Sequence, residues 1–123
     1  MREIKYKAYV KESREIGLVE KIDFWLKTVS VLLQEYEVTY KFDEVELLQY
    51  TGLKDKYGKE IYEGDILQFS GFVVTRGLVK YDEIFCCFQA CHNMSCWLLG
   101  KERGVEIEVI SNIYKNPEPV EGE

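Results

Sequence analysis

Four cysteines and the single histidine of the chain lie within eleven residues, from Cys86 to Cys96. Thiolates and an imidazole are suitable zinc ligands, so the candidate metal residues are Cys87, Cys91, His92 and Cys96. Structural zinc sites usually join two short-spaced ligand pairs from separate segments, whereas these residues form one local group without a C-x2-C pair. The spacing favours free cysteines acting as small apolar side chains, and a small zinc-dependent protein stays an alternative.

The same residues fit neither a nucleophile nor a disulfide framework. A reactive thiolate needs an electropositive environment and an oriented base, and Cys91 and His92, as neighbours on a strand, would point to opposite faces. Four closely spaced cysteines are also a poor framework for a whole domain, and cytoplasmic thiols are kept reduced. We therefore expect no catalytic residue, no bound metal and no disulfide bridge here.

Four carboxylates lie in the glycine-punctuated segment TGLKDKYGKEIYEGDI: Asp55, Glu60, Glu63 and Asp65. They could bind a divalent cation or act as acid and base, but they lack the ligand order of a calcium loop. Residues 55–58 instead fit a type I turn closed by a left-handed glycine, and residues 63–65 fit a second reversal. No phosphate loop, dinucleotide fingerprint or nucleophile elbow occurs, so we predict no cofactor and favour a protein that is not an enzyme.

The composition indicates a globular protein and disfavours nucleic-acid binding. The 123 residues include 16 basic and 22 acidic side chains, a net charge of −6, with 46% hydrophobic residues. A negative average surface repels phosphate. The best local basic group is Arg2, Lys5, Lys7 and Lys11. These cations are interspersed with glutamates and fit a solvated strand face, so a nucleic-acid-associated accessory factor is only the runner-up.

The elements that must position these residues are predicted to be strands. Alternating polar and apolar residues predict a first strand over residues 3–9 and a last one over 105–114. Residues 19–36 also have the 3-4 spacing of an amphipathic helix, but β-branched and aromatic residues favour strands there. The chain shows no signal-peptide segment and no run approaching the ~18 apolar residues of a transmembrane helix, so we expect a cytoplasmic protein without a membrane partner.

The fold class that follows is mainly β. We predict a single β-rich domain over residues 1–114, with a small barrel-like part, SH3-like or related, over about 45–114. The N-terminal part would be a β-rich extension with room for one short helix. Residues 115–123 carry both prolines and three glutamates and are expected to form a mobile acidic tail.

The central segment resembles the YopX family of phage and prophage proteins. The resemblance is carried by Gln49, Tyr50, Thr51, Gly52, Leu53, Asp55, Gly58, Ile61, Tyr62, Gly64, Asp65 and Ile66. The opening MREIKYKAY and the segment EVISNIYKNPE are similar to the two ends of that family. The resemblance implies a β-rich accessory protein acting in a bacterial host, with no assigned catalytic or cofactor residue. From the residues themselves we prefer a structural role for the motif, in turns and buried strands.

Aromatic residues make up 14% of the chain, more than a small core easily absorbs, so some of them are expected at the surface. The aromatic residues considered are Trp25, Tyr36, Tyr40, Tyr50, Tyr57, Tyr62, Tyr81, Phe85 and Trp97. Exposed tryptophan and tyrosine commonly anchor protein–protein contacts. The leading hypothesis is therefore a phage-encoded, non-enzymatic protein-interaction module with an unknown protein partner. Self-association into a homo-oligomer, through strand edges or aromatic patches, is part of this hypothesis.

Overall fold

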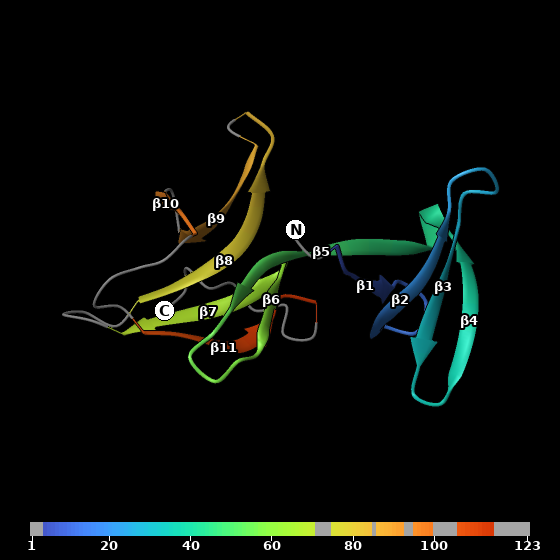
Figure 1. Ribbon diagram of the computed structural model, residues 1–123, viewed down its shortest axis with the longest axis horizontal. Coiled ribbons are helices and arrows are strands. Elements are labelled where there is room, and N and C mark those ends of the chain that lie inside the picture. Colours follow the sequence, from blue (N-terminus) through green and yellow to red (C-terminus); the bar gives the residue numbers. More distant parts are fainter. Residues whose placement is uncertain (1–3, 71–74, 85, 93–94, 100–105, 115–123) are drawn as a thin grey trace. The chain divides into compact units, whose positions relative to one another are not determined.

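The computed structural model describes residues 4–70, 75–84, 86–92, 95–99 and 106–114 (Figure 1). Within these residues the chain forms eleven strands and one 3-10 helix, and the strands pair antiparallel, as β1 does with β2 and β7 with β11. The prediction of a mainly β protein is confirmed. The chain divides into two compact units, Met1–Tyr50 and Thr51–Glu123. The expected tail, 115–123, lies outside the described residues.

The first unit is an antiparallel sheet with the strand order β4-β3-β2-β1-β5. Its elements are β1 (Tyr6–Val10), β2 (Glu15–Asp23), β3 (Thr28–Leu33), β4 (Tyr36–Lys41), the 3-10 helix η1 (Phe42–Glu44) and the first half of β5 (Val45–Lys54). The preference for strands over a helix in residues 19–36 is confirmed. A turn at 24–27 interrupts the apparent helical stripe, because Asp23 caps the amides of Trp25 and Leu26.

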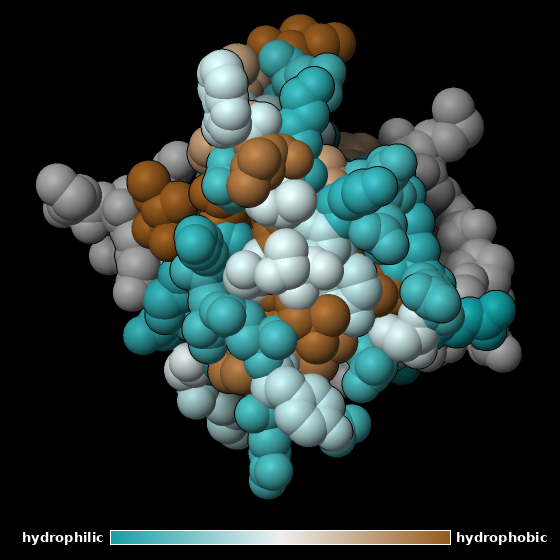
Figure 2. Space-filling view, turned by 90° about the vertical axis from the view of Figure 1, so that its right-hand side faces the viewer, coloured by the Kyte–Doolittle hydropathy of each residue, from teal (hydrophilic) through white to brown (hydrophobic). Residues whose placement is uncertain are grey.

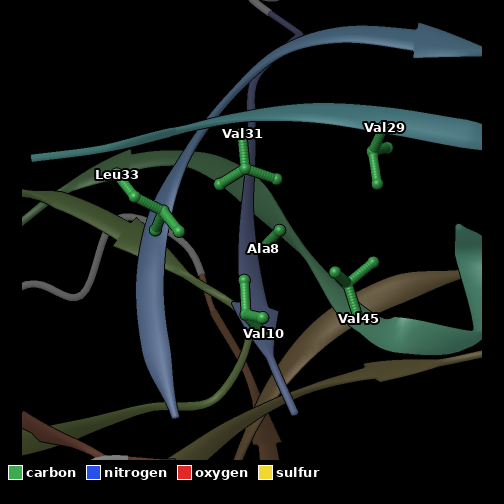
Figure 3. Packing of buried hydrophobic residues seen from close by; sticks show 6 residues of the cluster. All are labelled: Ala8, Val10, Val29, Val31, Leu33 and Val45. Atoms are coloured by element: carbon green, nitrogen blue, oxygen red, sulfur yellow. The ribbon is translucent and has the colours of Figure 1, made fainter. Parts of the chain in front are cut away.

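The core of this unit follows from the alternation of its strands. On β3, the residues Val29, Val31 and Leu33 are buried, and the residues between them face the other side of the sheet. They pack with Ala8, Val10 and Val45, and the six side chains gather between β1, β3 and β5 (Figure 3). The partly buried apolar residues that surround this cluster include Val38, Tyr40 and Phe42.

The second unit contains the rest of β5 and a five-stranded sheet in the order β10-β9-β8-β7-β11. Its strands are β6 (Glu60–Tyr62), β7 (Asp65–Ser70), β8 (Thr75–Asp82), β9 (Cys87–His92), β10 (Ser95–Leu98) and β11 (Glu106–Asn112). Strand β6 pairs with β5. The five-stranded sheet is open at β10 and β11, so the barrel-like description of the C-terminal half fits only roughly. Strand β11 confirms the predicted last strand, at a sheet edge.

The core of the second unit combines residues from β6, β7, β8, β9 and β11. Its buried members are Ile61, Leu67, Phe69, Val79, Ala90 and Val109. Some of their neighbours along the strands are buried as well, such as Tyr62 beside Ile61 and Ile66 beside Leu67. In the part of the chain that the structure describes, no helix is long and apolar enough to cross a bilayer. The cytoplasmic location stays a prediction.

Candidate functional site

Asp55 is a buried carboxylate at the end of β5 that collects backbone hydrogen bonds. Its Oδ1 accepts from the amides of Tyr57 and Lys59, each at 2.9 Å, and its Oδ2 accepts from Val109 at 3.0 Å. Burial alone would raise the pKa of this carboxyl, but the three amides and the nearby Lys59 charge outweigh it and lower the pKa. Asp55 is thus an ionised hydrogen-bond acceptor for backbone amides of the turn that it begins.

The side chains of Asp65 and Thr51 are likewise held by hydrogen bonds. Asp65 Oδ2 accepts from the amide of Tyr62 at 2.8 Å, and its Oδ1 accepts from the side-chain amide of Asn112 at 3.0 Å. Thr51 Oγ1 donates to the carbonyl of Ile61 at 2.8 Å and accepts from the Leu53 amide at 3.1 Å. These bonds tie β5 to β6 and β7 to β11, and they close the turn between β6 and β7.

The remaining motif residues lie on the strands and in the turns that this network joins. Tyr50, Ile61 and Tyr62 are buried, and Leu53 packs against the core of the second unit. Positive φ angles are found at Gly52, Gly58 and Gly64. The predicted turns at Gly58 and Gly64 are confirmed, since the Gly58 amide donates to the Asp55 carbonyl and residues 63–64 form the turn between β6 and β7. These contacts support the structural role that we prefer for the motif, which stays a prediction.

The four carboxylates of this segment do not form a metal site. Asp55 and Asp65 each serve separate backbone turns, and Glu60 Oε1 accepts the hydroxyl of Tyr62 at 3.1 Å. Within the described ranges, no group of three or more histidine, cysteine, aspartate or glutamate side chains could hold a metal ion. The arrangement provides hydrogen-bond acceptors for amides and leaves no converging oxygen cage.

The cysteine cluster corrects one expectation from the sequence. Cys91 and Cys96 form a disulfide, and their Cα atoms lie 4.1 Å apart, while Cys86 and Cys87 are free. The prediction of four reduced thiols was wrong for this pair because β9 and β10 form a hairpin that places Cys91 directly opposite Cys96. Cysteines too close in sequence to link distant parts of a domain can still form a disulfide between the two strands of one hairpin. Two of the four candidate zinc ligands are therefore bonded to each other, and His92 ends β9 beside them.

Two of the basic residues near the start of the chain contact aromatic and acidic groups of their surroundings. Lys5 Nζ lies over the ring of Tyr50 at 5.8 Å from its centroid. Lys11 Nζ lies 3.7 Å from Glu46 Oε1 and donates to the Asp43 carbonyl at 3.0 Å. These cations are dispersed over β1 and its surroundings among carboxylates, and Arg2 lies outside the described residues. The geometry gives no specific support to the nucleic-acid alternative.

The turn between β2 and β3 exposes three consecutive apolar side chains. We call residues 23–27 the apolar turn. Phe24 is 77% exposed, Trp25 92% and Leu26 67%. Some of the aromatic residues were expected at the surface, and Trp25 is one that is exposed. Phe24 and Leu26 were missed, because the sequence pattern placed both within a strand or an amphipathic helix. The signal that could have found them is Asp23, whose side chain favours a turn at the start of F-W-L-K.

The backbone of the apolar turn is fixed by hydrogen bonds. Asp23 Oδ1 accepts from the amides of Trp25 at 3.0 Å and Leu26 at 2.9 Å, and the Lys27 carbonyl accepts from the Phe42 amide at 3.0 Å. The rings of Phe24 and Phe42 meet edge to face, with centroids 6.2 Å apart. Figure 2 shows separate hydrophobic groups among polar residues on one side of the molecule. A partner that binds on that side would therefore contact small apolar groups and not one broad apolar face.

Comparisons with known proteins identify the family. The family model described as YopX protein matches residues 5–121. The chain belongs to the YopX family. This confirms the resemblance carried by the central motif. No curated protein matches the chain.

Two solved structures show the fold that the chain shares with YopX proteins. Protein yopX from Bacillus subtilis has a TM-score of 0.67 at 20% identity, and protein EF1440 from Enterococcus faecalis has a TM-score of 0.63 at 21% identity. In both cases the match covers 96% of this chain and 98% of the other. At this identity the likeness concerns the fold, so function has to be argued from this chain's own surface.

Proposed function

We propose that the chain is a non-enzymatic protein-interaction module, encoded by a phage or prophage, and that the apolar turn is its contact surface. The observation that carries this proposal is the exposure of Phe24, Trp25 and Leu26 on a hydrogen-bonded backbone. Large apolar side chains that project together into water gain free energy when a partner covers them. Tryptophan is also among the residues that most often dominate binding energy at protein interfaces.

Hydrogen bonds hold the backbone of the turn, and this order favours the binding of a partner. Because Asp23 and Lys27 already hold the turn in one conformation, a partner need not order the loop, and less conformational entropy opposes association. The partner would be a protein with an apolar depression large enough for an indole ring. The motif of the second unit adds no competing chemistry, because its buried carboxylates are engaged by backbone amides. The phage or prophage origin rests on the family resemblance.

The test compares a turn variant with a matched control. Tagged full-length protein carrying Phe24→Ser, Trp25→Ser and Leu26→Ser is used beside Ile84→Ser, which alters an exposed apolar residue in another turn. Both are incubated with extracts of phage-infected host cells, and proteins captured by the unaltered chain are purified for titration. We expect the turn variant to weaken binding about 30-fold or more and the control to leave it unchanged.

Equal affinity of the turn variant and the unaltered protein for every purified partner would contradict the proposal. Circular dichroism provides the folding control, and the altered side chains are exposed, so the variant should remain folded. Trp25 gives a second readout, because burial of its indole in a complex shifts the fluorescence emission to shorter wavelength.

A further inference from the structure

Strand β4 has an edge that no other described strand covers. In the strand order of the first unit β4 is terminal and pairs with β3 alone. It is six residues long, YEVTYK, and contains neither proline nor glycine. Such an edge presents a row of backbone N–H and C=O groups to any extended chain of suitable sequence.

The hydrogen bonds at the end of β4 show which of its backbone groups point outwards. The amide of Phe42 donates to Lys27 on the β3 side, whereas the amide of Lys41 donates to Glu44 Oε1 at 2.8 Å. Successive amides along a strand point to opposite edges. The N–H and C=O groups of Glu37 and Thr39 therefore point outwards like those of Lys41, towards the uncovered edge.

The sequence of this edge is complementary to itself. We propose that two copies of the chain pair antiparallel through β4, with Thr39 opposite the partner's Thr39. In this register Glu37 lies opposite the partner's Lys41, and the reverse pair occurs by symmetry. The two Thr39 residues exchange N–H···O bonds, and each Glu37 amide donates to the partner's Lys41 carbonyl. The Lys41 amide keeps its bond to Glu44.

The opposite charges favour this register over its neighbours. Glu37 and Lys41 are exposed, and their neighbours across β3 are the uncharged Leu32 and Thr28. Opposite charges directly across an antiparallel pair stabilise it, and like charges destabilise it. A register shifted to place Val38 opposite itself would put Glu37 against Thr39, and Lys41 would face Glu35, which lies in the turn before β4 and outside the paired strand. A shift by an odd number of residues would place residues whose backbone groups point towards the partner opposite residues whose backbone groups point towards β3. The hydrogen bonds between the two strands could then not form.

The other face of β4 also gains from this pairing. Tyr36, Val38 and Tyr40 share the face of the buried β3 residues, and Tyr36 is 66% exposed. In the proposed register Val38 lies opposite the partner's Tyr40, and Tyr36 lies opposite the partner's Phe42. Aromatic and β-branched cross-strand pairs stabilise sheets. The dimer would join two sheets into one and extend each apolar core across the shared edge.

A charge-exchange experiment tests the partner and the register together. The dissociation constant of the dimer is measured by sedimentation equilibrium from about 1 μM to about 1 mM of the full chain. Glu37→Lys and Lys41→Glu should each raise this constant about tenfold or more, since each places two pairs of like charges across the interface. The double variant restores both opposite pairs and should return the constant to near its original value. Glu20→Lys, an exposed change on β2, is the control and should have little effect.

Three outcomes would overturn this inference. They are a chain that stays monomeric over the whole range, a dimer indifferent to both single variants, and a double variant that dimerises no better than the single ones. The inference is tested separately from the proposed function, because Glu37 and Lys41 are not part of the apolar turn. Loss of dimerisation with intact partner binding, or the reverse, would show which of the two proposals fails.

Discussion

The backbone amide of Val109 donates a hydrogen bond of 3.0 Å to Oδ2 of Asp55, a residue 54 positions earlier in the chain. The neighbouring Lys56 amide donates to the Ile107 carbonyl at 2.9 Å. Lys56 Nζ also lies 3.4 Å from Glu106 Oε2. The turn after β5 is thereby docked on the edge strand β11. Because Asp55 supplies an ionised acceptor at this junction, the junction should depend on its charge.

Asp55→Asn should lower the free energy of unfolding by about 2–3 kcal/mol at pH 7, because an amide replaces an ionised oxygen that faces a backbone donor. The loss should depend on pH. The pKa of Asp55 is lowered from its ordinary value of 3.8, so its stabilising contribution is complete above that value and is lost as the pH falls through the lower folded-state pKa. Urea unfolding of both proteins between pH 7 and pH 3 measures the difference.

The difference in stability between the two proteins should therefore narrow as the solution is acidified below about pH 4. Other carboxylates titrate in both proteins, and their effects cancel in the difference. The control is Asp82→Asn, because Asp82 caps an exposed turn by accepting from Ile84. Asp82→Asn should lower the free energy of unfolding at pH 7 by less than Asp55→Asn does. A pH-independent difference for Asp55→Asn would show that the carboxylate's charge is not what holds the turn.

Two glycines of the motif have similar backbone angles but different surroundings. Gly58 has a φ of +81° and an added Cβ would meet nothing within 4 Å, whereas at Gly64, with a φ of +84°, it would lie 2.8 Å from Tyr114 Cε2. Gly58→Ala should cost about 1 kcal/mol from the left-handed backbone alone. Gly64→Ala should cost more, about 2 kcal/mol or above, since the ring must also move.

Thermal and urea unfolding of the two glycine variants test this order. Gly58→Asn serves as the control, because asparagine tolerates the left-handed region and should cost less than alanine there. Equal losses for both alanine variants would mean that the Tyr114 contact relaxes freely. The motif would then need its glycines for backbone conformation alone.

The parts of the structure that local patterns determine could be predicted from the sequence. The strands within residues 19–36 and the turns at Gly58 and Gly64 depend on residues close in the chain, and these predictions were correct. The helical spacing over residues 19–36 left two interpretations, because the Asx cap at Asp23 becomes decisive only once the hairpin forms. Side-chain pattern alone does not show which end of a hairpin is exposed.

Pairing between strands was the least predictable feature. The disulfide between Cys91 and Cys96 requires β9 and β10 to pair in one register, and a shift by one residue would separate the sulfurs. The hydrogen bond from Val109 to Asp55 likewise depends on where β11 lies, which no local signal specifies. The motif residues could be identified from the family resemblance, but the residues to which they hydrogen-bond could not.

The disulfide predicts a specific labelling pattern. When the purified chain is denatured without reductant and alkylated, two thiols should be modified, at Cys86 and Cys87, and reduction should raise the number to four. Closing so short a loop should stabilise the fold by about 2 kcal/mol, so reduction should lower the unfolding midpoint. Cys91→Ser with Cys96→Ser should lose a similar amount and become insensitive to reductant. Modification of all four thiols before reduction would contradict the bridge.

The prediction of a single domain can be tested because each compact unit has its own core. Val31 is fully buried in the first unit and Leu67 in the second, so truncation of either to alanine should cost about 2–4 kcal/mol. Strand β5 runs through the boundary, with Val45 in the first core and Leu53 against the second. Because β5 is one uninterrupted strand, unfolding of either unit should disrupt the part of β5 that belongs to the other. We expect one cooperative transition, with Val31→Ala and Leu67→Ala lowering the same midpoint in urea. Fluorescence and circular dichroism should follow the same curve, and a second transition that only one variant shifts would establish two independent domains.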